Sequence, residues 1–505
     1  MNNISLTKSK YCKGVQCPKI LWMDKYKQDV LGEKTDDSVF EQGKEVGELA
    51  KGLFGDYVDI PYNENRAVMV ENTEILLCDK KVITEASFRY DGNFCSVDIL
   101  KNDSEGVEIY EVKSTSNLEK RYDIYIHDVA YQYFVLSNLG LNVKRACIVY
   151  LDKEYRRHGE LDINQLFKIK DVTDEVLEKQ EEVKDIVAMI KEFMESHHND
   201  NEPEIDIGVY CFGPYECPFW QYCSRNLPRP NVFDLKGGMW TSTKFKKYYA
   251  GKVSFEDLQN EKLGEKYLEQ IDFELNDREP KIETEAIGEF LGTLKYPLYF
   301  IDYEAFNTAI PEYEGTGPYQ QIPFQYSLHI IREEGAPLEH KEFLGEIDDD
   351  NLVRTFAESM VDALPEDGSV IVYNRTFEES HVNKKLAEMY PDLKDEIERI
   401  NGNIVDIMVP FSNRNYYVKE MEGSTSLKYV LPALYPDDEE LDYSKLPEVH
   451  KGDEASQAFM SLKDETPERQ EEIRYGLLEY CKLDTYAMVK IWERFREVTY
   501  DGKIQ

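Results

Sequence analysis

Four cysteines that lie far apart in the sequence constrain the fold of this chain more than any other feature. Cys17 lies near the start, in Gln-Cys-Pro-Lys, whereas Cys211, Cys217 and Cys223 form a cluster much later in the chain. Thiols this distant in sequence bind one ion or cluster only if the intervening chain brings its ends together. We therefore expect one domain, closed by these cysteines, over about residues 5–228.

The dense cysteine cluster favours metal binding over a set of ordinary buried thiols, because it lies among prolines and aromatic residues. On spacing alone the four thiolates could equally hold zinc, and Cys12 is an alternative ligand to Cys17. The chain has nine cysteines, and an odd number argues against a disulfide framework. We expect the others in the core: Cys78, Cys95, Cys147 and Cys481.

Length and charge limit the classes of function. A chain of 505 residues is long enough for several cores, and we expect three domains. The formal net charge of -39 argues against binding a polyanion through bulk electrostatics, so any nucleic-acid contact must be local. The first residues lack the apolar segment of a secretory signal and no apolar run approaches membrane-spanning length, so we expect a cytoplasmic protein without membrane contact.

The first part of the chain has the strand and helix pattern of an α/β unit. Alternating apolar and polar residues predict a hairpin over 82–100, with its turn at Asp91-Gly92-Asn93. The segments that follow predict a strand over 107–112, a helix over 128–139, a strand over 144–151 and a helix over 177–196.

The rest of the chain divides into a connector and a second α/β pattern. Residues 229–294 contain polar segments with helical spacing, such as 255–271, and predict a helical connector. A near-continuous apolar run at 296–301 is typical of a buried central strand and opens a domain over 295–505. Further elements are predicted there: strands over 369–373 and 404–408, and helices over 377–389 and 475–494.

A first candidate site lies at Asp98, Glu111 and Lys113. Residues two apart on a strand face the same side, so Glu111 and Lys113 are expected to project from one edge strand while Asp98 comes from the neighbouring strand. Clustered carboxylates repel one another, and Mg²⁺ or Mn²⁺ is their usual counter-ion. We expect metal-assisted hydrolysis here, with the lysine beside the nucleophile and Glu85 as a further contributor.

These residues resemble the PD-(D/E)xK nucleases, in particular RecB-like and CRISPR-associated exonucleases closed by an iron–sulfur cluster. The resemblance covers about residues 5–228 and implies a restriction-endonuclease-like fold, a substrate-side glutamine at Gln132 and a [4Fe–4S] cluster, with zinc as the alternative. Its cluster ligands would be Cys17, Cys211, Cys217 and Cys223. That group often carries a metal-binding histidine before the core, and here Glu45 or Glu48 stands in the corresponding stretch.

A second candidate site is marked by carboxylates in apolar surroundings. Asp302 and Glu304 share one face of a strand, and burying such a pair without compensation costs several kcal/mol, so bound metal ions are the economical explanation. The predicted strand over 369–373 ends near Asn374, and Glu378 opens the helix that follows it. Tyr480 and Asp484 are four apart and share one helical face.

In this order the pieces resemble the DEDD exonucleases of the RNase H-like fold, over about residues 296–495. The resemblance implies two metal ions held by Asp302, Glu304, Glu378 and Asp484, with Tyr480 positioning the attacking water. Glu378 replaces the usual aspartate, and Asp406 resembles an accessory aspartate of that family. Gln325 and Lys428 are interpreted as solvated loop residues.

The whole arrangement resembles a bacterial and phage-associated family in which a RecB-like half is fused to a DEDD-like half. We therefore expect three segments: a PD-(D/E)xK domain over 1–228, a helical connector over 229–294 and an RNase H-like domain over 295–505. The expected activity is metal-dependent exonucleolytic cleavage of DNA at single-stranded or unwound ends. The alternatives are an RNA exonuclease, or a nucleic-acid-binding or assembly factor with degenerate sites. The expected partners are DNA with a free end and a helicase or other component of a defence or repair complex.

Overall fold

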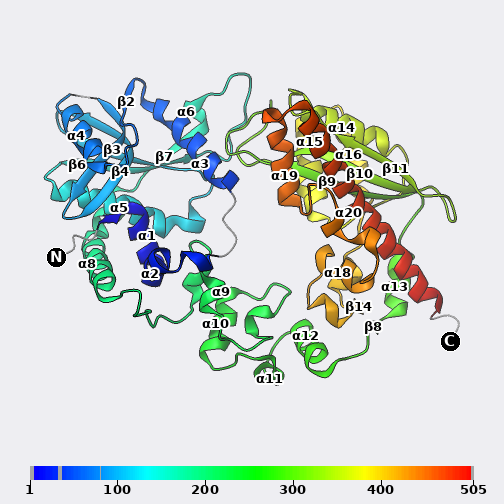
Figure 1. Ribbon diagram of the computed structural model, residues 1–505. Coiled ribbons are helices and arrows are strands. Elements are labelled where there is room, and N and C mark those ends of the chain that lie inside the picture. Colours follow the sequence, from blue (N-terminus) through cyan, green and yellow to red (C-terminus); the bar gives the residue numbers. More distant parts are fainter. Residues whose placement is uncertain (1–4, 32–36, 80, 502–505) are drawn as a thin grey trace. The chain divides into compact units, whose positions relative to one another are not determined.

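The chain folds into two compact units, seen in a computed structural model that describes residues 5–31, 37–79 and 81–501 (Figure 1). The first unit comprises Met1–Leu227 with Thr308–Tyr319, and the second comprises Pro228–Asn307 with Gln320–Gln505. The stretch expected as a helical connector, 229–294, falls within the second unit. Both units combine helices with a mixed sheet, so the protein is of the mixed α/β class.

The first unit is built on one sheet with the strand order β2-β3-β4-β5-β6-β7, in which β1 adds to β4. The strands are β1 (Leu6–Thr7), β2 (Tyr57–Asp59), β3 (Val82–Tyr90), β4 (Asn93–Asp103), β5 (Gly106–Lys113), β6 (Val143–Leu151) and β7 (Phe167–Asp171). The helices are α1 (Lys8–Gln16), α2 (Pro18–Tyr26), α3 (Asp37–Ala50), α4 (Arg66–Leu76), α5 (Tyr122–Asn138), α6 (Ile163–Leu166), α7 (Thr173–Glu178), α8 (Gln180–Ser196) and α9 (Trp220–Cys223).

Alternation along the strands gives this sheet a core on each face. On β6, Ala146 and Ile148 join the cluster that contains α5 and α8, whereas Cys147 and Val149 join the cluster that contains α3. The prediction of an edge strand was wrong, because β5 pairs antiparallel with β4 and parallel with β6. The first candidate site is therefore carried by a central strand.

The local predictions in this unit hold in outline. The hairpin of β3 and β4 turns at Asp91 and Gly92, whose φ angles of 45° and 76° suit a tight turn, as predicted. Helix α5 begins at Tyr122, earlier than predicted. The single helix predicted over 177–196 is two helices, α7 and α8, separated at Lys179.

The second unit is built on a five-stranded sheet with the order β11-β10-β9-β12-β13. Its strands are β8 (Lys281–Ile282), β9 (Leu298–Phe306), β10 (Ile322–Ile331), β11 (Glu339–Leu344), β12 (Ser369–Val372), β13 (Ile404–Asp406) and β14 (Tyr416–Tyr417), of which β8 and β14 form a separate pair. Its helices are α10 (Thr241–Tyr249), α11 (Phe255–Leu258), α12 (Glu265–Asn276), α13 (Thr284–Leu291), α14 (Leu352–Ala363), α15 (Lys384–Met389), α16 (Lys394–Gly402), α17 (Val409–Ser412), α18 (Leu427–Leu434), α19 (Gly452–Ser461) and α20 (Pro467–Asp501), with a π-helical turn η6 (Phe377–Asn383).

Strand β9 lies at the centre of this sheet, as its apolar sequence predicts. It pairs antiparallel with β10 and parallel with β12, and β12 pairs parallel with β13. The long helix α20 packs on β9 and β10 (Figure 1), and its Met488 and Trp492 share a core with Phe300. Helix α20 therefore brings late residues of the chain onto the strand that carries Asp302 and Glu304.

Within the described residues, the helices lack the combination of length and apolar sequence that crossing a membrane requires.

Candidate functional site

The first site gathers on β4 and β5 the three residues that the sequence singles out. The carboxylate of Asp98 accepts the backbone N–H of Val112 at 2.7 Å, which fixes it beside the next strand. Lys113 donates to Oε1 of Glu111 at 2.8 Å, so the pair expected on one strand face is in contact. Glu111 is 2% exposed, and a charged group this deep needs partners.

Two further charged residues complete this cluster, and sequence analysis missed both. Lys8 of α1 places its Nζ 2.7 Å from Oε1 of Glu111, 3.7 Å from Asp128 and 3.9 Å from Asp98. Asp128 of α5 also pairs with Lys113. No spacing pattern links these residues to the others, since each comes from a different helix.

The charges explain the protonation of the cluster. Burial raises the pKa of Asp98 to about 7, and the neighbouring Glu111 carboxylate adds to the shift. Burial also opposes ionisation of Glu111, but the ammonium groups of Lys113 and Lys8 outweigh it and lower the pKa of that carboxyl group. Glu111 is thus the permanent anion of the cluster. Asp98 exchanges its proton near neutrality and is the group that a divalent cation would keep ionised.

The other residues considered for the first site, Gln132, Glu85, Glu45 and Glu48, lie around it or on α3. Gln132 is fully buried on α5 and donates to Oε2 of Glu111 at 2.7 Å, so it orients that carboxylate. Glu85 has a φ of 56°, and burial raises its pKa while Lys8 opposes the shift. In α3, Glu45 is exposed and Glu48 pairs with Lys51 at 2.7 Å.

The ends of the first unit meet around the cysteines. Cys17 lies between α1 and α2, and the side chain of Gln16 next to it donates to the carbonyls of Tyr210 and Tyr215 at 2.8 and 2.7 Å. Lys19 reaches Glu202 at 2.8 Å. These contacts bring the start of the chain beside the late cysteine cluster.

The four thiols interact electrostatically. Burial raises the pKa of Cys211 to about 12, and Cys217, Cys17 and Cys223 contribute in the same direction. Among the described residues, one group of at least three His, Cys, Asp or Glu residues has its ligand atoms within 4.8 Å of one another, and it lies in the second unit. No three of these four cysteine sulfurs are therefore that close together. A tetrahedral zinc site with Zn–S bonds of about 2.3 Å would bring them to about 3.8 Å.

The other cysteines show one wrong prediction. Cys95, Cys147 and Cys481 are buried as expected, but Cys78 is exposed in the turn after α4. Cys12, the alternative cluster ligand, lies near Asp128, Lys113 and Lys8, whose charges act on its thiol. It therefore belongs to the surroundings of the first site.

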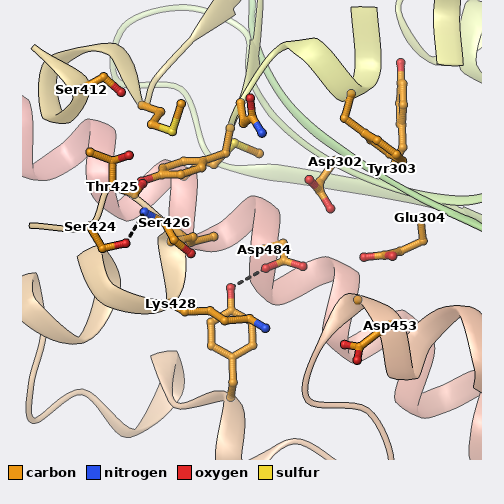
Figure 2. Close-up of a pocket in the computed structure, with 18 of the residues that line it drawn as sticks. Asp302, Tyr303, Glu304, Ser412, Ser424, Thr425, Ser426, Lys428, Asp453 and Asp484 are labelled. Carbon is orange, nitrogen blue, oxygen red and sulfur yellow. Dashed lines mark hydrogen bonds between the residues drawn. The ribbon is translucent and has the colours of Figure 1, made fainter. Parts of the chain in front are cut away.

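The second site lines a cavity of about 1000 Å³ in the second unit (Figure 2). Asp302 and Glu304 enter it from β9, and Tyr480 and Asp484 enter it from α20. Ligand atoms of Asp302, Glu304 and the buried Cys481 lie within 4.8 Å of one another, a spacing suited to one metal ion. Burial, together with Asp484, Glu304 and Glu378, raises the pKa of Asp302 well above its usual value.

Two tyrosines hold Asp484. Tyr443, from the segment before α19, donates its hydroxyl to Oδ1 at 2.5 Å (Figure 2), and its ring centroid lies 6.0 Å from that of Tyr480. Burial raises the pKa of Asp484 to about 6, although hydrogen bonds from Tyr443 and Tyr480 oppose the shift. Sequence analysis identified Tyr480 from its helical spacing but missed Tyr443, which begins a short 3-10 turn in a polar segment without a motif.

Glu378 lies in the π-helical turn η6, where the sequence predicts an ordinary helix over 377–389. It is 1% exposed, its Oε2 has no hydrogen-bond partner in the described structure, and burial raises its pKa to about 8. Its charge acts on Asp302 and Glu304, but Glu378 is not among the residues that line the cavity. π-Helical turns are rare and concentrate at functional sites.

The side chain of Asp406 holds the backbone of a turn next to the second site. Its two carboxylate oxygens accept the backbone N–H groups of Asn374 and Arg375, and Oδ1 also accepts that of Met408. Asn374 has a φ of 69°, a conformation that these bonds stabilise. Asp406 thus holds the turn that leads into η6 and Glu378.

Gln325 and Lys428 were predicted to lie in loops, and this prediction was wrong. Gln325 is fully buried on β10 and donates to the carbonyl of Leu477 at 2.7 Å. Lys428 lies in the first turn of α18, is exposed and lines the cavity.

Comparison with known proteins covers part of the chain. Residues 299–426 match a family model described as a domain of unknown function, DUF2779. The match includes Asp302, Glu304 and Glu378, but it ends before Tyr480 and Asp484. No curated protein matches the chain, and no solved structure matches it.

Proposed function

We propose that the chain is a divalent-metal-dependent exonuclease that removes nucleotides from single-stranded or unwound DNA ends. One observation carries this proposal. Asp302, Glu304, Glu378 and Asp484 converge in the second unit, and within the described residues none of them has a Lys, Arg or His partner within 4.0 Å. Four carboxylates without cations are stable as anions only when metal ions neutralise them.

The residues present fit Mg²⁺ or Mn²⁺, because carboxylate oxygens are the ligands that these ions prefer. A bound ion would lower the pKa of a water molecule and stabilise the charge that develops on the phosphate. Asp302 and Glu304 would hold it from β9, and Asp484 from α20. Tyr480 lines the same cavity and is positioned to orient the attacking water, while Tyr443 fixes Asp484.

The fold supports the same proposal. Three antiparallel strands followed by two parallel strands, with an acidic helix packed on the central strand, suit the RNase H-like architecture expected for residues 295–505. In the first unit, the pairing of Asp98, Glu111 and Lys113 on adjacent strands supports a PD-(D/E)xK site. The wide spacing of the four thiols supports a [4Fe–4S] cluster over zinc.

The first site also supports a second interpretation. Lys8 and Lys113 already supply two positive charges to three carboxylates, so this cluster needs a metal less than the second site does. The first unit would then bind the nucleic acid without cleaving it.

The test is cleavage of end-labelled single-stranded and duplex DNA and RNA by the purified protein with Mg²⁺ or Mn²⁺. We expect Asp302→Ala to lower the rate roughly a thousandfold, since metal coordination contributes several kcal/mol to catalysis. The matched control is Asp395→Ala, which removes an acid from the first turn of α16.

Comparing Lys113→Ala with Asp302→Ala assigns activity to one or both units. Absence of cleavage by the wild-type protein on all four substrates would refute the proposal, and preference for RNA would correct its substrate.

A further inference from the structure

The cavity of the second site has a basic end as well as an acidic one. Lys236, Lys266, Arg414 and Lys428 line it together with the carboxylates, although the chain as a whole carries a net charge of -39. Hydroxyl groups gather at this basic end. Figure 2 shows Ser412, Ser424, Thr425 and Ser426 on the opposite side of Asp484 from Glu304.

The loop that carries these hydroxyls is fixed by close packing. Gly423 has a φ of 77°, and a Cβ there would lie 2.3 Å from Oε1 of Gln270. Gln270 donates to the carbonyls of Glu422 and Asp234 at 3.0 and 3.1 Å, and its Oε1 accepts the backbone N–H of Lys236 at 3.1 Å. One buried amide therefore holds Lys236 and the hydroxyl-rich loop beside each other.

Helix α18 begins at this loop. Ser426 is its N-cap residue, with an extended backbone, and its side chain makes no capping hydrogen bond. The first N–H groups of a helix have no partner inside the helix and carry a partial positive charge. The start of α18 therefore adds donors to the end of the cavity where the hydroxyls lie.

Arg414 adds a buried positive charge behind this end of the cavity. It is 4% exposed and lines the cavity, and its Nη2 donates to the carbonyl of Gly423 at 2.9 Å. Within the described structure its Nε and Nη1 have no hydrogen-bond partner. The nearest carboxylate, Glu269, lies 3.6 Å from Nε and also accepts Lys281 at 2.8 Å, so it is shared between two cations. The guanidinium also lies over the ring of Tyr417, 4.1 Å from the ring centroid.

We propose that this end of the cavity is a phosphate pocket, formed by Arg414, Ser424–Ser426, Lys428 and Lys236, which binds a phosphate group of the nucleic-acid strand. The inference rests on the proposed function and names the group that anchors the substrate beside its metal site. Lys428 connects the two ends, because its charge acts on Asp484. Arg414 lies beneath the loop and strengthens the positive field behind the hydroxyls, while the exposed lysine and the hydroxyls contact the phosphate.

The ligand chemistry is the same for an internal phosphodiester and for a terminal phosphate. The test therefore uses labelled single-stranded oligothymidylate with and without a terminal phosphate, titrated by fluorescence anisotropy in Ca²⁺. The protein is the full chain with Asp302→Asn, which removes a ligand of the second site, while Ca²⁺ in place of Mg²⁺ or Mn²⁺ suppresses cleavage at either site. Lys236→Ala and Lys428→Ala remove side chains that are at least partly exposed, so these variants are expected to fold.

We expect the double lysine variant to bind about tenfold more weakly and the slope of log affinity against log salt to fall by about 0.7 for each lysine that contacts a phosphate. Arg414→Gln is expected to weaken binding similarly, with circular dichroism as the check on folding. The control is Lys394→Ala, which removes an exposed lysine from α16. Loss on both oligonucleotides would assign the pocket to an internal phosphodiester, and loss confined to the phosphorylated one would assign it to a terminal phosphate.

Unchanged affinity and salt slope in the double lysine variant would overturn the phosphate pocket. Cleavage by the wild-type protein is measured separately. Lysine-dependent binding without any cleavage would leave the pocket standing and reject the exonuclease. Cleavage by the wild-type protein, together with binding that does not depend on the lysines, would support the exonuclease and reject the phosphate pocket.

Discussion

The ammonium group of Lys8 lies 2.7 Å from one carboxylate oxygen of Glu111 and 2.9 Å from the other, so helix α1 supplies a cation to the central strand of the first unit. Within the residues that the structure describes, the carboxylates of the second site have no Lys, Arg or His partner within 4.0 Å. Three of these carboxylates, Asp302, Glu304 and Asp484, line a cavity that Lys236, Lys266, Arg414 and Lys428 also line. The two acidic clusters of this chain therefore differ in how strongly they require a metal ion.

Replacing Lys8 by methionine is expected to tighten binding of Mn²⁺ at the first site about tenfold. The ammonium competes with a divalent ion for Asp98, Glu111 and Asp128, and a tenfold change needs about 1.4 kcal/mol, a part of the roughly 4 kcal/mol that a charge pair at about 4 Å near a protein surface is worth. Electron paramagnetic resonance of bound Mn²⁺ measures the affinity, in a chain whose second site is inactivated by Asp302→Asn. Lys10→Met, an exposed lysine of the same helix, is the control. Equal affinities in the two variants would show that Lys8 does not compete.

Cys17→Ser is expected to abolish an iron–sulfur cluster, whereas Cys12→Ser is expected to retain it. Cys17 interacts electrostatically with the late cysteines, while Cys12 lies near the first site. Iron and acid-labile sulfide content after anaerobic purification, together with visible absorption, give the answer. A wild-type protein with stoichiometric zinc and no iron would contradict the cluster.

Local sequence patterns predicted much of both sites. Asp98, Glu111 and Lys113 lie on segments whose alternation is visible in sequence, and the apolar run before Asp302 marks a central strand. The error on β5 has a physical cause. A strand with charged residues on one face resembles a solvated edge, and the partner strand β6 that makes it central follows only after a helical crossover.

What the sequence could not predict comes from packing between distant elements. Lys8 and Asp128 reach the first site from two helices, and Tyr443 reaches Asp484 from a short turn without any motif. The π-helical turn at Glu378 depends on one extra residue per turn, and helical periodicity over so short a stretch does not separate it from an α-helix. Arg414 was missed because only the fold shows that its guanidinium is buried beneath Gly423.

Gly423→Ala is expected to destabilise the protein by about 2 kcal/mol or more. The residue combines a φ of 77° with close contact to Gln270, so an added Cβ meets both backbone strain and a clash. The midpoint of urea unfolding measures the change. Gly402→Ala is the matched control, because a Cβ at the end of α16 meets nothing within 4 Å, and we expect it to change stability by no more than about 1 kcal/mol. Equal losses in both variants would contradict the packing of the loop.

The metal-free protein is expected to lose stability as the pH rises from about 4 to about 8. Burial raises the pKa of Asp484 to about 6 and that of Glu378 to about 8, whereas both carboxyl groups titrate near pH 4 in an unfolded chain. The folded protein therefore binds more protons than the unfolded one in this range, and its stabilising contribution disappears as those protons leave. Mg²⁺ replaces the protons, so the stabilisation by added Mg²⁺ should grow with pH. Melting temperatures measured in EDTA and in Mg²⁺ across this range test both statements, with Asp484→Asn expected to weaken the dependence. A melting temperature in EDTA that rises with pH would show that the carboxylates of the second site are compensated in some other way.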